Sequence, residues 1–221
     1  MTDVVLVERD GDIATVVFNR PEKLNAFTKA MWKRLGQVVN ELSLDTGLRC
    51  IVFRGAGDRA FSPGNDISEF ANERSNSVQA EAYGMLMNKA IKAFRACSVP
   101  KVAMIKGVCV GGGLEIAGLC DIRICGESSR FGAPEALQKG IVNRIFADDA
   151  VEAEAMATAR RIADGAPLVH RWHRKFLGRL ADPKPLSEDE IKEAYACFDT
   201  EDFKTGYQAF LDKKKPDFEG R

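Results

Sequence analysis

The alternation of apolar and polar positions divides the chain into short strands and amphipathic helices. Residues 3–8 and 13–18 alternate in character around Asp10-Gly11-Asp12, which predicts a β-hairpin. Residues 28–43 have apolar side chains at helical spacing, with Thr28 as a plausible N-cap. Further apolar runs predict buried strands at 50–55, 101–107, 121–127 and 141–146, and a long helix at about 76–97. From about residue 148 onward the pattern is helical throughout.

This order of elements predicts an α/β fold in two parts. Residues 1–147 are expected to form a core of strands and helices, and residues 148–221 a helical region. The strands are too short and too widely spaced for a β-sandwich, so helices are expected to cover the sheet.

Composition excludes several classes of partner. The 32 basic and 32 acidic residues balance to a formal charge of zero, so neither nucleic acid nor an anionic membrane is expected as the main partner. No apolar run approaches the ~18 residues of a membrane span. The first residues, MTDVVLVERDGD, have acids where a signal peptide has bases. A cytoplasmic protein is therefore expected.

Metal and disulfide chemistry find little support in the sequence. Six cysteines occur without a CxxC pair, mostly in apolar runs, which favours buried free thiols over metal or disulfide use. His170 and His173 lie three residues apart on a predicted helix among basic and aromatic neighbours. A zinc site would need a third ligand, so an exposed basic helix face is the favoured interpretation.

Two glycine-containing segments are candidates for binding an anionic oxygen. In Ala60–Ile67 (AFSPGNDI), Pro-Gly predicts a tight turn after a strand, whose outward amides lack a backbone acceptor. Gly111-Gly112-Gly113 predicts the start of a short apolar helix and allows close approach of a ligand to the backbone. It has neither dinucleotide-fold nor phosphate-loop spacing. Each segment alone also fits a purely structural role.

Two carboxylates accompany these segments. Glu115 falls in the apolar stretch LEIAGLC, where a buried carboxylate is costly unless it is paired or functional. Both a structural and a catalytic role remain open from this feature. Glu135 ends the segment 129–135 (SRFGAPE). Two carboxyls in one dry site repel, so one would hold a proton that the other can accept, as adding water across a double bond requires.

In their order and spacing, these segments resemble the enoyl-CoA hydratase/isomerase (crotonase) superfamily. The resemblance covers nearly the whole chain. Its matching segments are 19–26 (NRPEKLNA), 60–67, 107–115 (GVCVGGGLE), 131–135 (FGAPE), 140–143 (GIVN) and 210–216 (FLDKKKP).

The resemblance implies a spiral of ββα turns followed by a C-terminal helical region that mediates trimer formation, as a homotrimer or a dimer of trimers. It implies an oxyanion hole for a thioester carbonyl at the amides of Asn65 and Gly112, and catalytic glutamates at Glu115 and Glu135. Asn65 stands where alanine is common, which leaves the amide intact but changes the neighbouring pocket. Further positions expected to bind the substrate are Lys23, Ala60, Ser62, Gly64, Asp66, Ile67, Gly111 and Lys213.

The chain departs from the superfamily after the second glutamate. Members usually carry a longer segment there, with a glycine-rich turn and a helix that lines the acyl pocket, whereas Glu135 is followed almost directly by Gly140. Either the deletion is genuine, or residues are missing from the sequence. We expect the second, with an interruption near Glu135–Ala136. A genuine deletion would remove a wall of the pocket and favour an altered activity.

The implied reaction is reversible hydration of a 2-enoyl-CoA, without a metal or redox cofactor, because the thioester itself accepts the electrons. Coenzyme A is then part of the substrate. Double-bond isomerisation needs only one carboxylate and is the nearest alternative. Other enolate chemistry of acyl-CoA (racemisation, decarboxylation, hydrolysis) and a non-catalytic CoA-binding paralogue also remain open.

The last helices carry more apolar side chains than a short tail needs to cover itself. We therefore expect them to pack against a neighbouring subunit. The apolar positions are Phe198, Phe203, Tyr207, Phe210 and Leu211. The run Lys213-Lys214-Lys215 that follows is either a contact for CoA phosphates or a solvated surface.

Overall fold

A computed structural model describes residues 3–131 and 140–221. Its strands are β1 (Val5–Asp10), β2 (Ile13–Phe18), β3 (Cys50–Gly55), β4 (Ala60–Ser62), β5 (Lys101–Ile105), β6 (Val108–Cys109), β7 (Ile122–Gly126), β8 (Arg130–Phe131) and β9 (Arg144–Phe146). Its α-helices are α1 (Lys29–Leu44), α2 (Phe70–Glu73), α3 (Ser77–Ala96), α4 (Gly112–Gly118), α5 (Val151–Ala163), α6 (Pro167–Arg179), α7 (Glu188–Tyr195) and α8 (Glu201–Leu211). The predicted hairpin, helices and longer strands are confirmed. The last strand is shorter than the predicted 141–146.

The strands form two sheets, and the chain visits them alternately. The larger sheet has the order β1-β2-β3-β5-β7-β9, antiparallel only between β1 and β2, and the smaller has the parallel order β4-β6-β8. After β3, β5 and β7 the chain crosses to β4, β6 and β8 respectively, and helices follow the first two pairs. This repetition confirms the predicted spiral of ββα turns.

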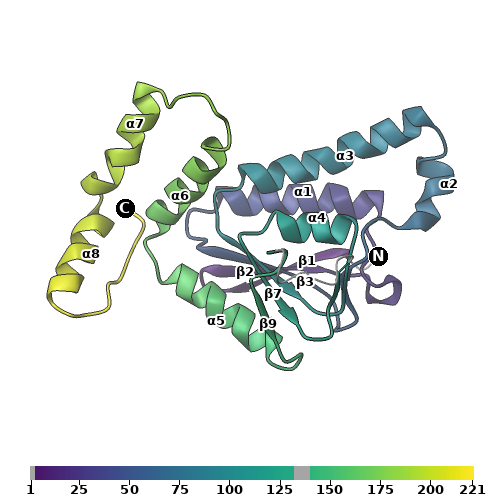
Figure 1. The fold of residues 1–221 in the computed structure, drawn as a ribbon, viewed down its shortest axis with the longest axis horizontal. Helices are drawn as coiled ribbons and strands as arrows, with labels where there is room; N and C mark the ends of the chain where they lie inside the picture. Colours follow the sequence, from purple (N-terminus) through teal and green to yellow (C-terminus); the bar gives the residue numbers. More distant parts are fainter. Residues whose placement is uncertain (1–2, 132–139) are drawn as a thin grey trace.

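Both faces of the larger sheet are buried (Figure 1). Successive side chains of a strand point to opposite faces, so β3 contributes Ile51 and Phe53 to one layer and Cys50 and Val52 to the other. Helices α1, α3 and α4 cover the first face, and α5 covers the second through side chains such as Ala155. This explains why the strands read as continuous apolar runs.

Capping side chains mark where helices α1 and α3 begin. The Thr28 hydroxyl accepts a hydrogen bond from the Met31 amide at the start of α1, as predicted. Asn76 caps α3 in the same way through the Gln79 amide. Such caps replace one of the partners that the first amides of a helix lack.

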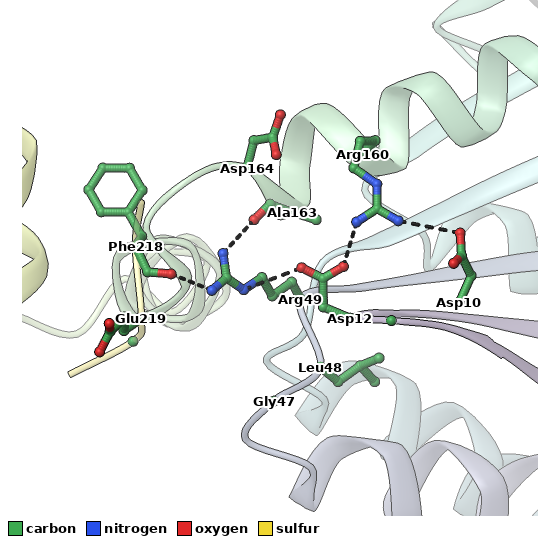
Figure 2. A network of polar contacts seen from close by, with 12 residues as sticks. Asp10, Asp12, Gly47, Leu48, Arg49, Arg160, Ala163, Asp164, Phe218 and Glu219 are labelled. Carbon is green, nitrogen blue, oxygen red and sulfur yellow. Dashed lines mark hydrogen bonds and ion pairs between the residues drawn. The ribbon is translucent and has the colours of Figure 1, made fainter. Parts of the chain in front are cut away.

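Helix α6 lies beside the core, where Arg171 donates to the carbonyls of Asp45 and Leu48 at 3.0 Å. Helices α7 and α8 lie farther out, and a segment after α8 returns towards the core (Figure 1). Arg49, directly before β3, links this segment to the core (Figure 2). Its guanidinium lies 3.4 Å from the Asp12 carboxylate and donates to the carbonyls of Ala163, at 3.0 Å, and Phe218. Arg160 on α5 bonds the same Asp12 at 2.7 Å. The boundary predicted between residues 147 and 148 remains a prediction.

Five of the six cysteines are buried and all six are free thiols, as predicted. Burial is the main reason that the pKa of the Cys50 thiol rises to about 12. Within the described ranges, no group of three His, Cys, Asp or Glu side chains could hold a metal ion. None of the described helices is both long and apolar enough to cross a membrane.

Candidate active site

Two neighbouring strands of the smaller sheet place the two glycine-containing segments together. β4 and β6 run parallel, with Ala60 opposite Val108 and Ser62 opposite Cys109. Parallel strands end at the same edge of a sheet, so the turn at 63–65 lies beside the triple glycine. The short strands β4 and β6 were not predicted from the sequence, because two or three residues give no periodicity.

The two turns touch at Gly64 and Gly112. A methyl group added to Gly64 would lie 2.6 Å from the Gly112 nitrogen, and one added to Gly112 would lie 3.4 Å from the Gly64 Cα. With ordinary bond lengths, this contact limits the distance between the Asn65 and Gly112 nitrogens to about 6.6 Å. Two N–H···O bonds to a shared oxygen span up to about 6.4 Å between the nitrogens, so the contact allows both amides to bond one oxygen atom.

Both amides are available to a ligand. Phe27 forms a parallel bridge to Asn65, accepting from the Asp66 amide at 2.9 Å and donating to the Gly64 carbonyl at 2.7 Å. In such a bridge the backbone amide of Asn65, the residue between Gly64 and Asp66, points away from Phe27. Within residues 3–131 and 140–221, neither the Asn65 nor the Gly112 amide donates to an acceptor of the protein.

Buried hydrogen bonds fix the first turn. The Ser62 hydroxyl is fully buried, donates to the Asn25 carbonyl at 2.9 Å and accepts from the Gly64 amide at 3.0 Å. The Asn25 side chain donates to the Ala60 carbonyl at 2.7 Å and accepts from the Arg20 amide at 3.1 Å. Ser62 and Ala60 therefore hold the turn in this structure rather than presenting side chains to a ligand.

Asn25 was missed as a site residue, although it stands in the segment that carries the resemblance. It is 1% exposed and adopts a left-handed conformation with φ of 61°. Asparagine tolerates that conformation better than most residues. A buried asparagine in a loop could have suggested such a role, but the carbonyls to which its side chain donates, of Ala56 and Ala60, lie more than thirty residues away.

Trp32 on α1 lies beside both turns and was also missed. Its indole N–H donates to Asn65 Oδ1 at 2.8 Å, and a methyl group on Gly112 would lie 3.2 Å from its Cζ2. Because an indole N–H only donates, it fixes the orientation of the Asn65 amide group. The Asn65 Nδ2 then faces Met87 Sδ at 3.8 Å.

Asp66 begins the short helix Ile67–Glu69 and is anchored to the loop before α1. Its carboxylate accepts from the Ser68 hydroxyl at 2.7 Å and pairs with Arg20 at 3.0 Å. The Ser68 hydrogen bond, with a further contribution from Arg20, lowers the pKa of the Asp66 carboxyl. Ile67 is 76% exposed, which leaves an apolar side chain on the surface next to the turn.

Glu115 on α4 lines a groove of about 580 Å³ between α3 and α4. Met87 lines the same groove, so its contact with Asn65 connects the groove to the paired turns. The Glu115 side chain is exposed, and the expectation of a costly buried carboxylate is therefore wrong. The apolar neighbours of Glu115 belong to the opposite, core-facing side of the helix.

The remaining predicted site residues are distributed as follows. Gly111, with φ of 50°, precedes α4 and lies against Pro63. Lys23 is exposed in the loop before α1. Lys213 is exposed and follows α8, a helix that lies far from α4 (Figure 1). Glu135, and with it the interruption expected at Glu135–Ala136, falls outside the described residues.

A family model described as enoyl-CoA hydratase/isomerase matches residues 8–137 and 128–221. The chain belongs to the enoyl-CoA hydratase/isomerase family. The two matched segments overlap over residues 128–137, which include the second predicted glutamate, Glu135.

Relatives and solved structures agree with this membership. The chain is 28% identical to a short-chain-enoyl-CoA hydratase of Clostridium acetobutylicum over 251 positions, with 96% of this chain and 95% of that protein covered. It is 25% identical to a crotonyl-CoA hydratase of Syntrophomonas wolfei, with 97% of each covered. A crystal structure of an enoyl-CoA hydratase/carnithine racemase from Magnetospirillum magneticum superimposes with a TM-score of 0.97 at 41% identity, covering 100% of this chain and 97% of that one.

Proposed function

We propose that this protein is an enoyl-CoA hydratase that adds water reversibly to a 2-enoyl-CoA thioester. The observation that carries the proposal is the meeting of two free amides, of Asn65 and Gly112, beside the groove that Glu115 lines. Family membership and the two relatives named as hydratases support the same reaction.

In this proposal the two amides bind the thioester carbonyl oxygen. Water attacks C3 of the enoyl group, and the electron pair of the double bond moves towards the carbonyl to form an enolate. The amides stabilise that negative charge, and one such donor is worth about 3 kcal/mol in a transition state. A proton then adds to C2. The thioester is the electron sink, so the reaction needs neither a metal nor a redox cofactor.

We assign the proton transfers to Glu115 together with Glu135. One carboxylate would take a proton from the attacking water, and the other, as a carboxylic acid, would deliver a proton to C2. Glu115 is the only one of the pair within the described residues. Isomerisation, which moves one proton between carbons and needs only a single carboxylate, is the second candidate.

For the CoA moiety we propose contacts with basic side chains of two subunits. Lys23 is exposed in the loop that bonds to the first turn, while Lys213 follows α8, which lies far from α4 in the same chain (Figure 1). Lys213 would thus serve the site of a neighbouring subunit in a homotrimer or a dimer of trimers. The apolar side chains of the last helices support assembly, since Phe210 is 83% exposed and Leu211 65% exposed. Light scattering that finds only monomers at micromolar concentration would contradict this.

We also propose a cytoplasmic location. Free thiols persist in reducing compartments and pair in oxidising ones, and all six cysteines of this chain are unpaired. Fractionation of cells that produce the protein tests the location directly.

The activity is tested with crotonyl-CoA, by following the loss of the conjugated absorbance and identifying the product. A hydratase gives 3-hydroxybutyryl-CoA, whereas an isomerase converts a 3-enoyl-CoA into the conjugated 2-enoyl-CoA. Glu115→Gln should lower kcat by about a hundredfold or more. Glu81→Gln, at an exposed glutamate of α3 outside the groove, should leave kcat unchanged. Binding of CoA thioesters without turnover would indicate a non-catalytic paralogue instead.

A further inference from the structure

The groove beside the paired amides contains two arginines that form no ion pair with any carboxylate in residues 3–131 and 140–221. Arg74 precedes α3 and Arg95 lies near its end, and both line the groove with Glu115. Among the described residues, neither guanidinium forms an ion pair, whereas Arg20, for example, is paired with a carboxylate at 3.0 Å. Among the described residues that line the groove, two positive charges without an ion pair therefore accompany one carboxylate, that of Glu115.

Arg74 is held in place by aromatic rings. The centre of its guanidinium lies 4.6 Å from the centroid of the Phe70 ring and 5.0 Å from that of Tyr83. Burial, with a contribution from Glu69, raises the pKa of the Tyr83 phenol, so the ring stays neutral. A cation over an aromatic face uses the π side of the guanidinium. The N–H groups at its edge remain free to donate.

A fixed guanidinium edge is suited to one kind of ligand. Two parallel N–H groups match the two oxygens of a carboxylate, and such charge-assisted pairs are short and strong. Because the rings already order the Arg74 side chain, binding a carboxylate costs little further conformational entropy.

The rest of the lining fits a short hydrocarbon chain that ends in such a group. Side chains that are small or apolar form most of it, and the polar ones other than Glu115 can donate hydrogen bonds. The small and apolar residues are Gly84, Met87, Ile91, Gly118 and Leu119, and the donors are Arg74, Asn88 and Arg95. A purely alkyl acyl group would cover Arg74 and remove water from its charge without a partner, which is unfavourable.

We propose that the acyl group accepted by this groove carries a carboxylate at its far end, bound by Arg74. The substrate class is thus the mono-CoA thioester of an unsaturated dicarboxylic acid. The inference rests on the proposed function only in taking the thioester to lie at Asn65 and Gly112.

Binding of unreactive thioesters tests the inference without requiring turnover. Glutaryl-CoA and pentanoyl-CoA have acyl chains of the same length, but the first ends in a carboxylate and the second in a methyl group. Adipyl-CoA and hexanoyl-CoA form a second pair of this kind. Isothermal calorimetry of the full chain should show at least one diacid thioester binding about tenfold or more tightly than its methyl-ended counterpart, as expected for a charged hydrogen bond. Equal or weaker binding of both diacid thioesters would overturn the proposal.

Variants show whether Arg74 is responsible. Arg74→Gln should abolish the preference for the diacid thioester and leave the affinity for its methyl-ended counterpart within about twofold, because only the carboxylate partner is removed. Arg74→Lys should retain part of the preference, since a lysine keeps the charge but not the fork of donors. Lys92→Gln, on α3 outside the groove, is the matched control and should change neither affinity.

Other outcomes are equally informative. Loss of the preference in Arg95→Gln but not in Arg74→Gln would overturn the assignment to Arg74. If Arg74→Gln weakens the binding of the diacid thioester and of its methyl-ended counterpart equally, the preference does not come from Arg74. That result, with Arg74→Lys unchanged in thermal stability and in preference, would also overturn the assignment to Arg74. If neither crotonyl-CoA nor glutaconyl-CoA, the 2-enoyl thioester that ends in a carboxylate, is hydrated while glutaryl-CoA is preferred, the proposed reaction fails and the carboxylate site stands.

Discussion

Replacing Gly64 by alanine adds one methyl group at the contact between the two turns. The new carbon would lie 2.6 Å from the Gly112 nitrogen and 3.4 Å from the Gly112 Cα. Both are backbone atoms, so no flexible side chain can move aside. The turns must separate by several tenths of an ångström, which changes the distance between the Asn65 and Gly112 amides.

Two effects of this substitution can be separated. Gly64 has a φ of 93°, and a residue with a side chain in such a conformation costs about 1–3 kcal/mol of stability. The loss of one well-placed donor to an oxyanion costs about 2.7–4 kcal/mol in the transition state, or about a hundred- to a thousandfold in kcat. We therefore expect a folded, less stable variant whose kcat falls far more than its KM rises.

Gly57→Ala is the matched control. Gly57 also has a positive φ, of 70°, but nothing lies within 4 Å of a methyl group added there. It should share the loss of stability in urea denaturation while keeping the rate of crotonyl-CoA hydration. A Gly64→Ala enzyme with a kcat within about threefold of the wild type would refute the reasoning, and so would an equal loss of rate in Gly57→Ala.

Three further predictions concern the buried turn, the C-terminal segment and the thiols. Ser62→Ala leaves the Gly64 amide and a carbonyl without their partner and should cost about 1–3 kcal/mol in the free energy of unfolding; a variant as stable as the wild type in urea would show that the hydroxyl is not needed. Arg49→Met removes the contacts of Arg49 with Asp12, Ala163 and Phe218 that Figure 2 shows and should speed limited proteolysis of the segment after α8. Arg34→Met, at an exposed pair, should not change that rate, and equal rates in both variants would contradict the linking role. Iodoacetamide at pH 8 should label the partly exposed Cys197 first, because the thiolate is the reactive form and burial raises the pKa of four other thiols to about 11 or 12. Mass spectrometry that finds a buried cysteine labelled before it would contradict this order.

Much of the architecture could be predicted because its signals are local. The hairpin of β1 and β2 follows from two alternating runs around a glycine turn, and the Thr28 cap from a hydroxyl placed directly before an apolar helix. The inner strands β3 and β5 of the larger sheet are apolar on both faces because helices cover both, so a short apolar run was a sufficient signal. The two glycine segments could be named as candidates because their signals are also local: tight turns and helix starts depend on neighbouring residues.

The tertiary structure decided how these pieces meet. No local pattern brings Ser62 to the carbonyl of Asn25, the indole of Trp32 to the side chain of Asn65, or Gly64 against Gly112. It also decided that Glu115 is exposed in a groove rather than buried, because the partner of its helix on that side is α3 across an open space. The sequence by itself determined the helices and the longer strands, the cysteine chemistry and the family. The site depends on contacts between residues far apart in the chain, which only the packing of the two sheets and their helices creates.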